Sequence, residues 1–233
     1  LTCVETFDGS SWSNAQGTNT ARRSMPDNHT GNIYDILAMG GDSPVILLTE
    51  EWNGTTWVNS CNMLIGVNNG QGGGSANAGF VAGGQSPYPL TTEQYEKQFI
   101  SPYTTSVWSS GASNILAKSG GKGAGDSSAA LTFGGTISPA RVACTEEYNG
   151  TNWSAGGSMI NAVRYHGGTG LQDAALRAAG YNGSSYVTCT EKYDGSSWSA
   201  SGANINAKAV MGIAGLQDAA VMFGGEPIQS TSE

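Results

Sequence analysis

Glutamates and basic residues are the chemically active side chains that recur at fixed spacing along this chain. A carboxylate can serve as a general acid, base or nucleophile, and a group of cations can hold an anionic ligand. Each recurring glutamate lies two residues before an aromatic residue, as Glu191 does before Tyr193. In a strand both side chains then point to one face, so we expect the glutamate to be half-buried, hydrogen-bonded and structural rather than catalytic. The register consists of Glu5, Glu50, Glu93, Glu146 and Glu191.

Half of the ten basic residues gather ten or eleven positions after a tryptophan. They are Arg22, Arg23, Lys118, Arg164 and Lys208. One interpretation is that they pair with the repeated glutamates or form a solvated rim. The other is that Arg22, Lys118, Arg164 and Lys208 form a ring at one channel mouth that binds an anionic group, such as an acidic sugar. Such a site would be modest, because exposed charges contribute little individually.

Metal and nucleophile chemistry has little support. The chain has two histidines, His29 and His166, and four cysteines without CxxC spacing. Three cysteines share one repeat position, which would place them more than about 7 Å apart at Cα, too far for a disulfide. We expect free thiols, no metal, no cofactor and no enzymatic activity. A hydrolase using Asp173 and Asp218 near a channel mouth is a further alternative.

Composition excludes several classes of protein. The formal net charge is −8, with ten basic residues, which argues against nucleic-acid binding because phosphates require a basic face. No stretch approaches the ~18 apolar residues of a membrane span, so we expect no membrane insertion. Glycine contributes 35 of 233 residues, about twice its usual share, and charged residues contribute 12%, about half of theirs.

An internal repeat organises all of these positions. The phrase Tyr193-Asp194-Gly195-Ser196-Ser197-Trp198 returns with small changes along the chain, and its tryptophans are separated by 45, 51, 45 and 45 residues. These tryptophans are Trp12, Trp57, Trp108, Trp153 and Trp198. A glycine pair forms a second marker in the same register, reduced to Ala179-Gly180 in the fourth copy. Its second members are Gly41, Gly84, Gly135, Gly180 and Gly225.

One repeat predicts four short strands. Asp194-Gly195 between strand-like residues indicates a hairpin turn with positive φ at both central positions. Residues 186–193 alternate and are rich in Val, Thr and Tyr, residues 174–180 form a short apolar run, and residues 164–170 form a glycine-rich strand. Four strands in about 45 residues, with a fixed aromatic and glycine pair, are typical of a β-propeller blade.

The repeat resembles the kelch repeat in its glycine pair, followed by Tyr193 and Trp198, and in Met159 and Arg164 before the innermost strand. It departs from the kelch pattern because the tyrosine before the glycine pair is missing. The Gly/Asn/Ser-rich style of residues 193–198 and 170–175 is also similar to repeat proteins encoded by tailed bacteriophages. The first resemblance implies a β-propeller, and the second implies a virion-associated protein.

We predict a single all-β domain over residues 1–233, a five-bladed kelch-like propeller of four-stranded blades. The chain begins with outer strands, at residues 2–7 and from Trp12 onward, and ends with inner strands, at residues 206–225. The N-terminal strands should therefore complete the last blade and protect its edges. Residues 230–233 conflict with this, because they look like another third strand. Either this tail peels away, or the chain is part of a longer array.

The third repeat carries six extra residues between Tyr95 and Trp108. The insertion includes Phe99, Ile100 and Tyr103, which are apolar or aromatic. Loops on rigid scaffolds often carry contacts, so we expect these residues to form an interaction loop. The other interpretation is a tolerated insertion that covers a hydrophobic edge.

Together these features favour a non-enzymatic structural or attachment module of a virion, such as a phage tail fibre, decoration or host-recognition propeller. Its partners would be other virion proteins or a host-surface glycan, at the virion surface or outside the cell. The alternative is a secreted propeller lectin that binds carbohydrate between blades through aromatic stacking and Asn or Asp hydrogen bonds.

Overall fold

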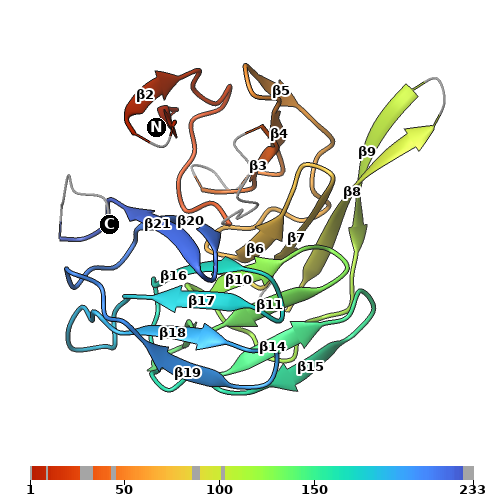
Figure 1. Ribbon diagram of the computed structural model, residues 1–233. Coiled ribbons are helices and arrows are strands. Elements are labelled where there is room, and N and C mark those ends of the chain that lie inside the picture. The colour runs from red at the N-terminus through yellow and green to blue at the C-terminus, as the bar shows by residue number, and fades with distance from the viewer. Residues whose placement is uncertain are drawn as a thin grey trace.

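The structure of the chain is a computed structural model that describes residues 2–8, 10–26, 34–42, 46–85, 90–100 and 103–227. The regular elements of these residues are all strands, arranged as small antiparallel sheets around a common axis (Figure 1). The all-β propeller fold is thereby confirmed. Among the described residues, no helix is long and apolar enough to cross a membrane.

Four sheets form recognisable blades. The innermost strands of the second, third and fourth blades contact one another in turn around the axis, and the last of them contacts β20 (Gly212–Leu216). The strands are β3 (Ile36–Met39), β4 (Thr49–Trp52) and β5 (Trp57–Asn59) in the first blade; β6 (Gln71–Gly74), β7 (Ala78–Ala82), β8 (Thr92–Ile100) and β9 (Tyr103–Ser110) in the second; β10 (Lys122–Gly125), β11 (Ala130–Phe133), β14 (Thr145–Tyr148) and β15 (Trp153–Gly156) in the third; and β16 (Gly167–Gly170), β17 (Ala175–Ala178), β18 (Thr190–Tyr193) and β19 (Trp198–Ser201) in the fourth.

Three further hairpins accompany the blades. The N-terminal hairpin joins β1 (Val4–Phe7) to β2 (Trp12–Ala15), and the C-terminal hairpin joins β20 (Gly212–Leu216) to β21 (Ala219–Phe223). A small hairpin of β12 (Thr136–Ile137) and β13 (Ala140–Arg141) projects from the third blade.

The predicted closure of the ring is not confirmed. Within the described residues, the N-terminal and C-terminal hairpins are separate two-stranded sheets, so they do not form a fifth four-stranded blade. Residues 230–233, which resemble a third strand and would compete with the N-terminal strands for the last blade, lie outside the described residues. Five blades and a seal by the N-terminal strands therefore remain predictions.

The repeated tryptophans join each blade to the one before it. Trp108 Nε1 donates to Thr49 Oγ1 at 3.0 Å, and Trp198 Nε1 donates to Thr145 Oγ1 at 2.9 Å. Both indoles are buried, so these bonds satisfy donors that would otherwise be costly to bury. The repeat position is thus occupied by tryptophan because it supplies both apolar area and a donor directed at the neighbouring blade.

The hairpin turns differ from the predicted two-residue form. Tyr193 and Trp198 are direct strand partners, which leaves a four-residue turn between them, and Gly195 has a φ of 88° whereas Asp194 has no positive φ. The Asp194 carboxylate instead accepts the backbone N–H groups of Ser196 and Ser197 at 2.9 and 2.8 Å. These bonds lower the pKa of Asp194 to about 2. The repeated spacing therefore encodes a side-chain-capped turn.

Candidate functional site

A ring of five residues surrounds one mouth of the central cavity. Each lies twelve positions after a repeated tryptophan and has a left-handed backbone, with φ between 50° and 66°. The five are Ser24, Asn69, Gly120, Tyr165 and Val210, and all of them line the cavity. This conformation turns the chain sharply into the innermost strand, so the five residues present their peptide groups to one another around the axis.

Backbone hydrogen bonds run along this axial ring from blade to blade. Asn69 N–H donates to Ser24 O at 2.8 Å, and Gly120 N–H donates to Asn69 O at 3.3 Å. Tyr165 N–H continues to Gly120 O at 2.7 Å, and Val210 N–H continues to Tyr165 O at 2.8 Å. The ring is therefore a fixed rim rather than a set of independent loops.

The cavity inside this rim has a volume of about 810 Å³. Its polar lining includes Arg22, Arg23, Asn69, Lys122 and Tyr165. Arg23 is the most solvent-exposed of the cations for which an ion pair is described, with 74% of its side chain exposed, and it lies 3.6 Å from Asp42. A cavity of this size with a mixed lining can hold a small polar ligand.

Two of the predicted ring cations form buried ion pairs with glutamates inside the blades. Arg22 forms a buried ion pair with Glu50 and also donates to Leu48 O at 3.0 Å. Lys118 Nζ lies 3.2 Å from Glu146 Oε1, and both side chains are buried. The ion-pair interpretation therefore describes Arg22 and Lys118, since their charges are balanced by the repeated glutamates.

The repeated glutamates act as caps for backbone amides. Glu146 accepts the N–H groups of Ile115 and Leu116 at 2.7 and 3.3 Å, and Glu50, Glu93 and Glu191 accept the equivalent pairs in their own blades. These four carboxylates are 0–1% exposed, more deeply buried than predicted. Burial raises the pKa of Glu93, whose blade has Val67 at the position of Arg22 and Lys118.

In the fourth blade a different repeat position supplies the cation that pairs with the buried glutamate. Arg177 on β17 forms the buried ion pair with Glu191, and Arg164 is half-buried against the ring of Tyr165. Lys208 is fully buried. The structure thus does not bring Arg22, Lys118, Arg164 and Lys208 together as a cluster of exposed cations at the channel mouth.

Arg164 instead belongs to a cluster of tyrosines and arginines between the third and fourth blades. Its guanidinium lies 4.7 Å from the ring centroid of Tyr165 and 5.5 Å from that of Tyr181. Arg141 on β13 lies 5.3 Å from the Tyr181 ring, and Tyr186 packs 5.7 Å from it. We call these five residues the Tyr181 cluster. The repeat analysis missed it because Arg141, Tyr181 and Tyr186 do not recur at one repeat position.

A second glutamate in each of two blades links neighbouring blades, and the sequence analysis also missed it. Glu51 accepts a hydrogen bond from Tyr95 of the next blade, and Glu147 accepts one from Tyr193. Burial and the Glu147 bond raise the pKa of Tyr193 to about 12. The sequence feature that could have indicated these links is the doubled glutamate, in Glu50-Glu51 and Glu146-Glu147.

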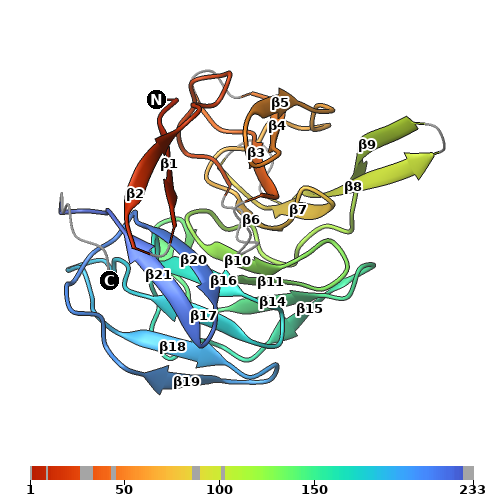
Figure 2. The ribbon, with the colours of Figure 1, turned by 45° about the horizontal axis from the view of Figure 1, so that its top comes forward.

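The inserted segment of the third repeat is mostly strand rather than loop. β8 and β9 remain paired from Tyr95↔Trp108 out to Ile100↔Tyr103, and the hairpin projects from the body of the molecule (Figures 1 and 2). Its base is anchored by Lys97, whose Nζ lies 2.6 Å from Glu51. The side chains of Phe99, Ile100 and Tyr103 lie outside the described residues.

The remaining candidates for chemistry are separated or paired. His166 is fully buried beside Phe133, and burial lowers its pKa to about 3. Asp218 forms an exposed ion pair with Lys192 at 2.7 Å. The four cysteines are free thiols, and among the described residues no three His, Cys, Asp or Glu side chains converge on a metal position. His29 lies outside the described residues.

Comparisons with known proteins give the fold alone. No family model matches the chain, and no curated protein matches it. A similar solved structure is one titled "Structure of YjhT", with a TM-score of 0.73 and 14% sequence identity over 99% of this chain and 86% of that chain. At this identity the likeness shows that the chain shares a β-propeller fold with that protein.

Proposed function

We propose that this chain is a non-enzymatic attachment module of a virus particle, of the kind carried by tailed phages. The propeller serves as a rigid platform, and the projecting β8–β9 hairpin contacts another protein of the particle. The observation that carries the proposal is that hairpin, because the corresponding hairpins of the third and fourth blades end at the aromatic–tryptophan pair.

The anchoring of the hairpin suits a contact element. Glu51 of the first blade accepts hydrogen bonds from Lys97, Tyr95 and Ser106. The base of the hairpin is therefore joined to the neighbouring blade. A projection held in this way loses little conformational freedom when it binds. Beyond this base, residues 98–100 pair with residues 103–105 without a described contact to the body.

The test replaces residues 96–107 by the four-residue turn that joins Tyr148 to Trp153. Particles from the native source are separated on a density gradient, and the recombinant chain is added to particles depleted of it. The full chain should co-sediment with the particles, whereas the shortened chain should remain at the top with unchanged circular dichroism. Lys192→Ala, in the exposed ion pair with Asp218 on the fourth blade, is the matched control and should still co-sediment. A native chain found free in solution would overturn the proposal.

The Tyr181 cluster supports a second candidate, a lectin that binds an acidic carbohydrate. Tyrosine rings stack on sugars, and Arg141 and Arg164 would pair with a carboxylate on the sugar. Two neighbouring blades contribute to the cluster, which is where the lectin alternative requires its site. Glycan-array binding that is lost in Tyr181→Ala and kept in the hairpin-shortened chain would favour this candidate over particle attachment.

A further inference from the structure

Two sets of backbone hydrogen bonds pass from blade to blade, and both stop at the same place. The first is the axial ring, in which Ser24 N–H should donate to Val210 O if the ring were closed. The second set joins the glycine pair of one blade to the start of the next, as in Gly135 N–H to Val163 O and Gly180 N–H to Lys208 O, both 2.8 Å. The equivalent bond from Gly225 would reach Arg22 O.

Neither closing bond is present among the described residues. The four groups concerned, Ser24 N–H, Val210 O, Gly225 N–H and Arg22 O, make no other backbone bond there. The ring is therefore interrupted between the C-terminal hairpin and the first blade.

The N-terminal hairpin lies at this interruption, in a blade position of its own. Trp198 of the fourth blade packs on Phe133 of the third, with ring centroids 4.9 Å apart. Trp12 packs on Phe223 of the C-terminal hairpin in the same way, at 5.1 Å. Because a repeated tryptophan contacts the preceding blade, β1–β2 follows the blade of β20–β21 rather than completing it (Figures 1 and 2).

The contacts on the other side of the N-terminal hairpin support the same placement. Trp153 Nε1 of the third blade donates to Ala112 O, four residues after the tryptophan of the second blade, at 3.1 Å. Trp57 Nε1 donates to Gln16 O, four residues after Trp12, also at 3.1 Å. The first blade therefore contacts β1–β2 in the way that the third blade contacts the outer half of the second.

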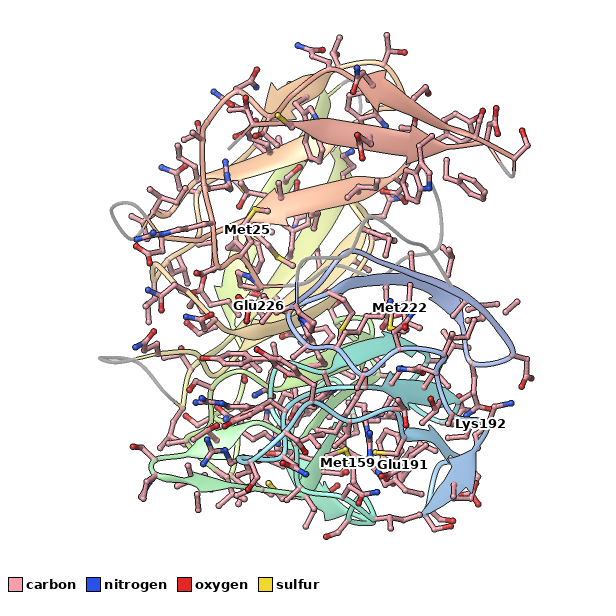
Figure 3. All side chains as sticks on the ribbon, turned by 90° about the vertical axis from the view of Figure 1, so that its left-hand side faces the viewer. Met25, Met159, Glu191, Lys192, Met222 and Glu226 are labelled. Atoms are coloured by element: carbon pink, nitrogen blue, oxygen red, sulfur yellow. The ribbon has the colours of Figure 1, made fainter. Side chains whose placement is uncertain are left out.

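No strand of the described residues fills the inner half of that blade position. Cys3 and Val4 of the N-terminal hairpin line the 810 Å³ cavity together with residues 36–38 of the first blade and residues 210–212 of the C-terminal hairpin. Glu5, the member of the glutamate register in β1, is exposed and caps no amide among the described residues. Figure 3 views the molecule from this side, where Met25 and Met222 lie.

We propose that this open position binds an inner β-hairpin of the chain's own repeat type, that is, the first two strands of a further repeat. Its chemistry follows from the neighbouring blades. A Cβ at Gly168 would lie 2.5 Å from Lys122 Cβ, and one at Gly123 would lie 2.6 Å from Gly72 O, so adjacent innermost strands require glycine where they meet. The inference is independent of the proposed attachment function.

A hairpin with the sequence of residues 163–181 would complete both sets of bonds. Its equivalent of Tyr165 would donate to Val210 O and accept Ser24 N–H. Its equivalent of Val163 would accept Gly225 N–H, and its equivalent of Gly180 would donate to Arg22 O. All four groups left over at the interruption are then paired at the moment when the added hairpin covers them, which peptide groups require on burial.

The experiment adds this synthetic peptide to the full chain and follows amide exchange by NMR. In the free chain we expect the Ser24 and Gly225 amides to exchange faster than those of Asn69 and Gly135. The peptide should slow both by on the order of tenfold or more and raise the melting temperature. A peptide with Gly168→Val should do neither, and Trp12→Ala in the chain should weaken binding, whereas the hairpin-shortened chain should bind normally.

A second arm fuses residues 158–188 directly before Cys3, in place of residues 1–2, because Cys189 and Cys3 share one repeat position. The fusion raises the effective concentration of the hairpin, so it should protect both amides even where the free peptide binds weakly. Absence of protection in both arms overturns the proposal. It is also overturned if the two amides are already protected in the monomeric free chain, or if light scattering shows that a second copy of the chain protects them.

Discussion

Arg177 on β17 and Glu191 on β18 lie directly opposite each other and form a buried ion pair. In the first and third blades the same carboxylate position is neutralised from another direction, by Arg22 and Lys118 in the segment before the innermost strand. The blade therefore requires a cation within reach of its buried carboxylate, and different repeat positions can supply it.

Arg177→Met should destabilise the chain by about 3–5 kcal/mol, because it leaves the Glu191 carboxylate buried without its cation. The measurement is the free energy of unfolding in urea at neutral pH. Lys192→Met is the control, since the Lys192–Asp218 pair is exposed and should contribute less than about 1 kcal/mol. Equal losses in the two variants would contradict the assignment of Arg177.

Trp153→Phe should cost about 2 kcal/mol or more. The change removes a donor that bonds Thr92 Oγ1 at 3.0 Å and Ala112 O at 3.1 Å and leaves a space in the interface between two blades. Trp12→Phe should cost less than half as much, because Trp12 is 38% exposed. Urea unfolding of the two variants side by side provides the comparison, and a larger loss for Trp12 would speak against the role of the indole bonds.

Gly180→Ala should destabilise the chain by at least about 2 kcal/mol. Gly180 has a φ of 110°, and a Cβ there would lie 2.8 Å from His166 Cβ. Gly202→Ala is the matched control, because nothing lies within 4 Å of the added atom, and its effect should stay within about 0.5 kcal/mol. Thermal unfolding of both variants tests whether the second glycine of the pair is required by its backbone and its neighbours.

His166 should make the chain less stable in acid. Its folded pKa of about 3 lies below the ordinary value of 6.5, so the unfolded chain binds a proton between these values and the folded chain does not. The free energy of unfolding should therefore fall as pH drops below about 6.5, by about 1.4 kcal/mol per pH unit from this group. In His166→Phe the difference from the parent chain should change with that slope between pH 6 and 4. A difference that is constant over this range would show that His166 is not buried in its neutral form.

The blade itself was predictable from the sequence. The tryptophan and glycine-pair registers identified four-stranded antiparallel units correctly, because strand alternation and left-handed glycines are set by neighbouring residues, although the capped form of the turn was not predicted. The structural roles of Trp153 and Gly180 could be inferred in the same way, since each repeat provides an independent copy of the same local arrangement.

The arrangement between repeats was decided by the tertiary structure. Whether Glu191 pairs with Arg164 or with Arg177 depends on which side chain reaches a buried carboxylate, and nothing in the repeat spacing records that distance. The position of the N-terminal hairpin depends likewise on Trp12 packing against Phe223, more than two hundred residues away. Local periodicity determines the shape of a blade, whereas contacts and hydrogen bonds between distant segments decide how the blades and the two terminal hairpins are arranged around the axis.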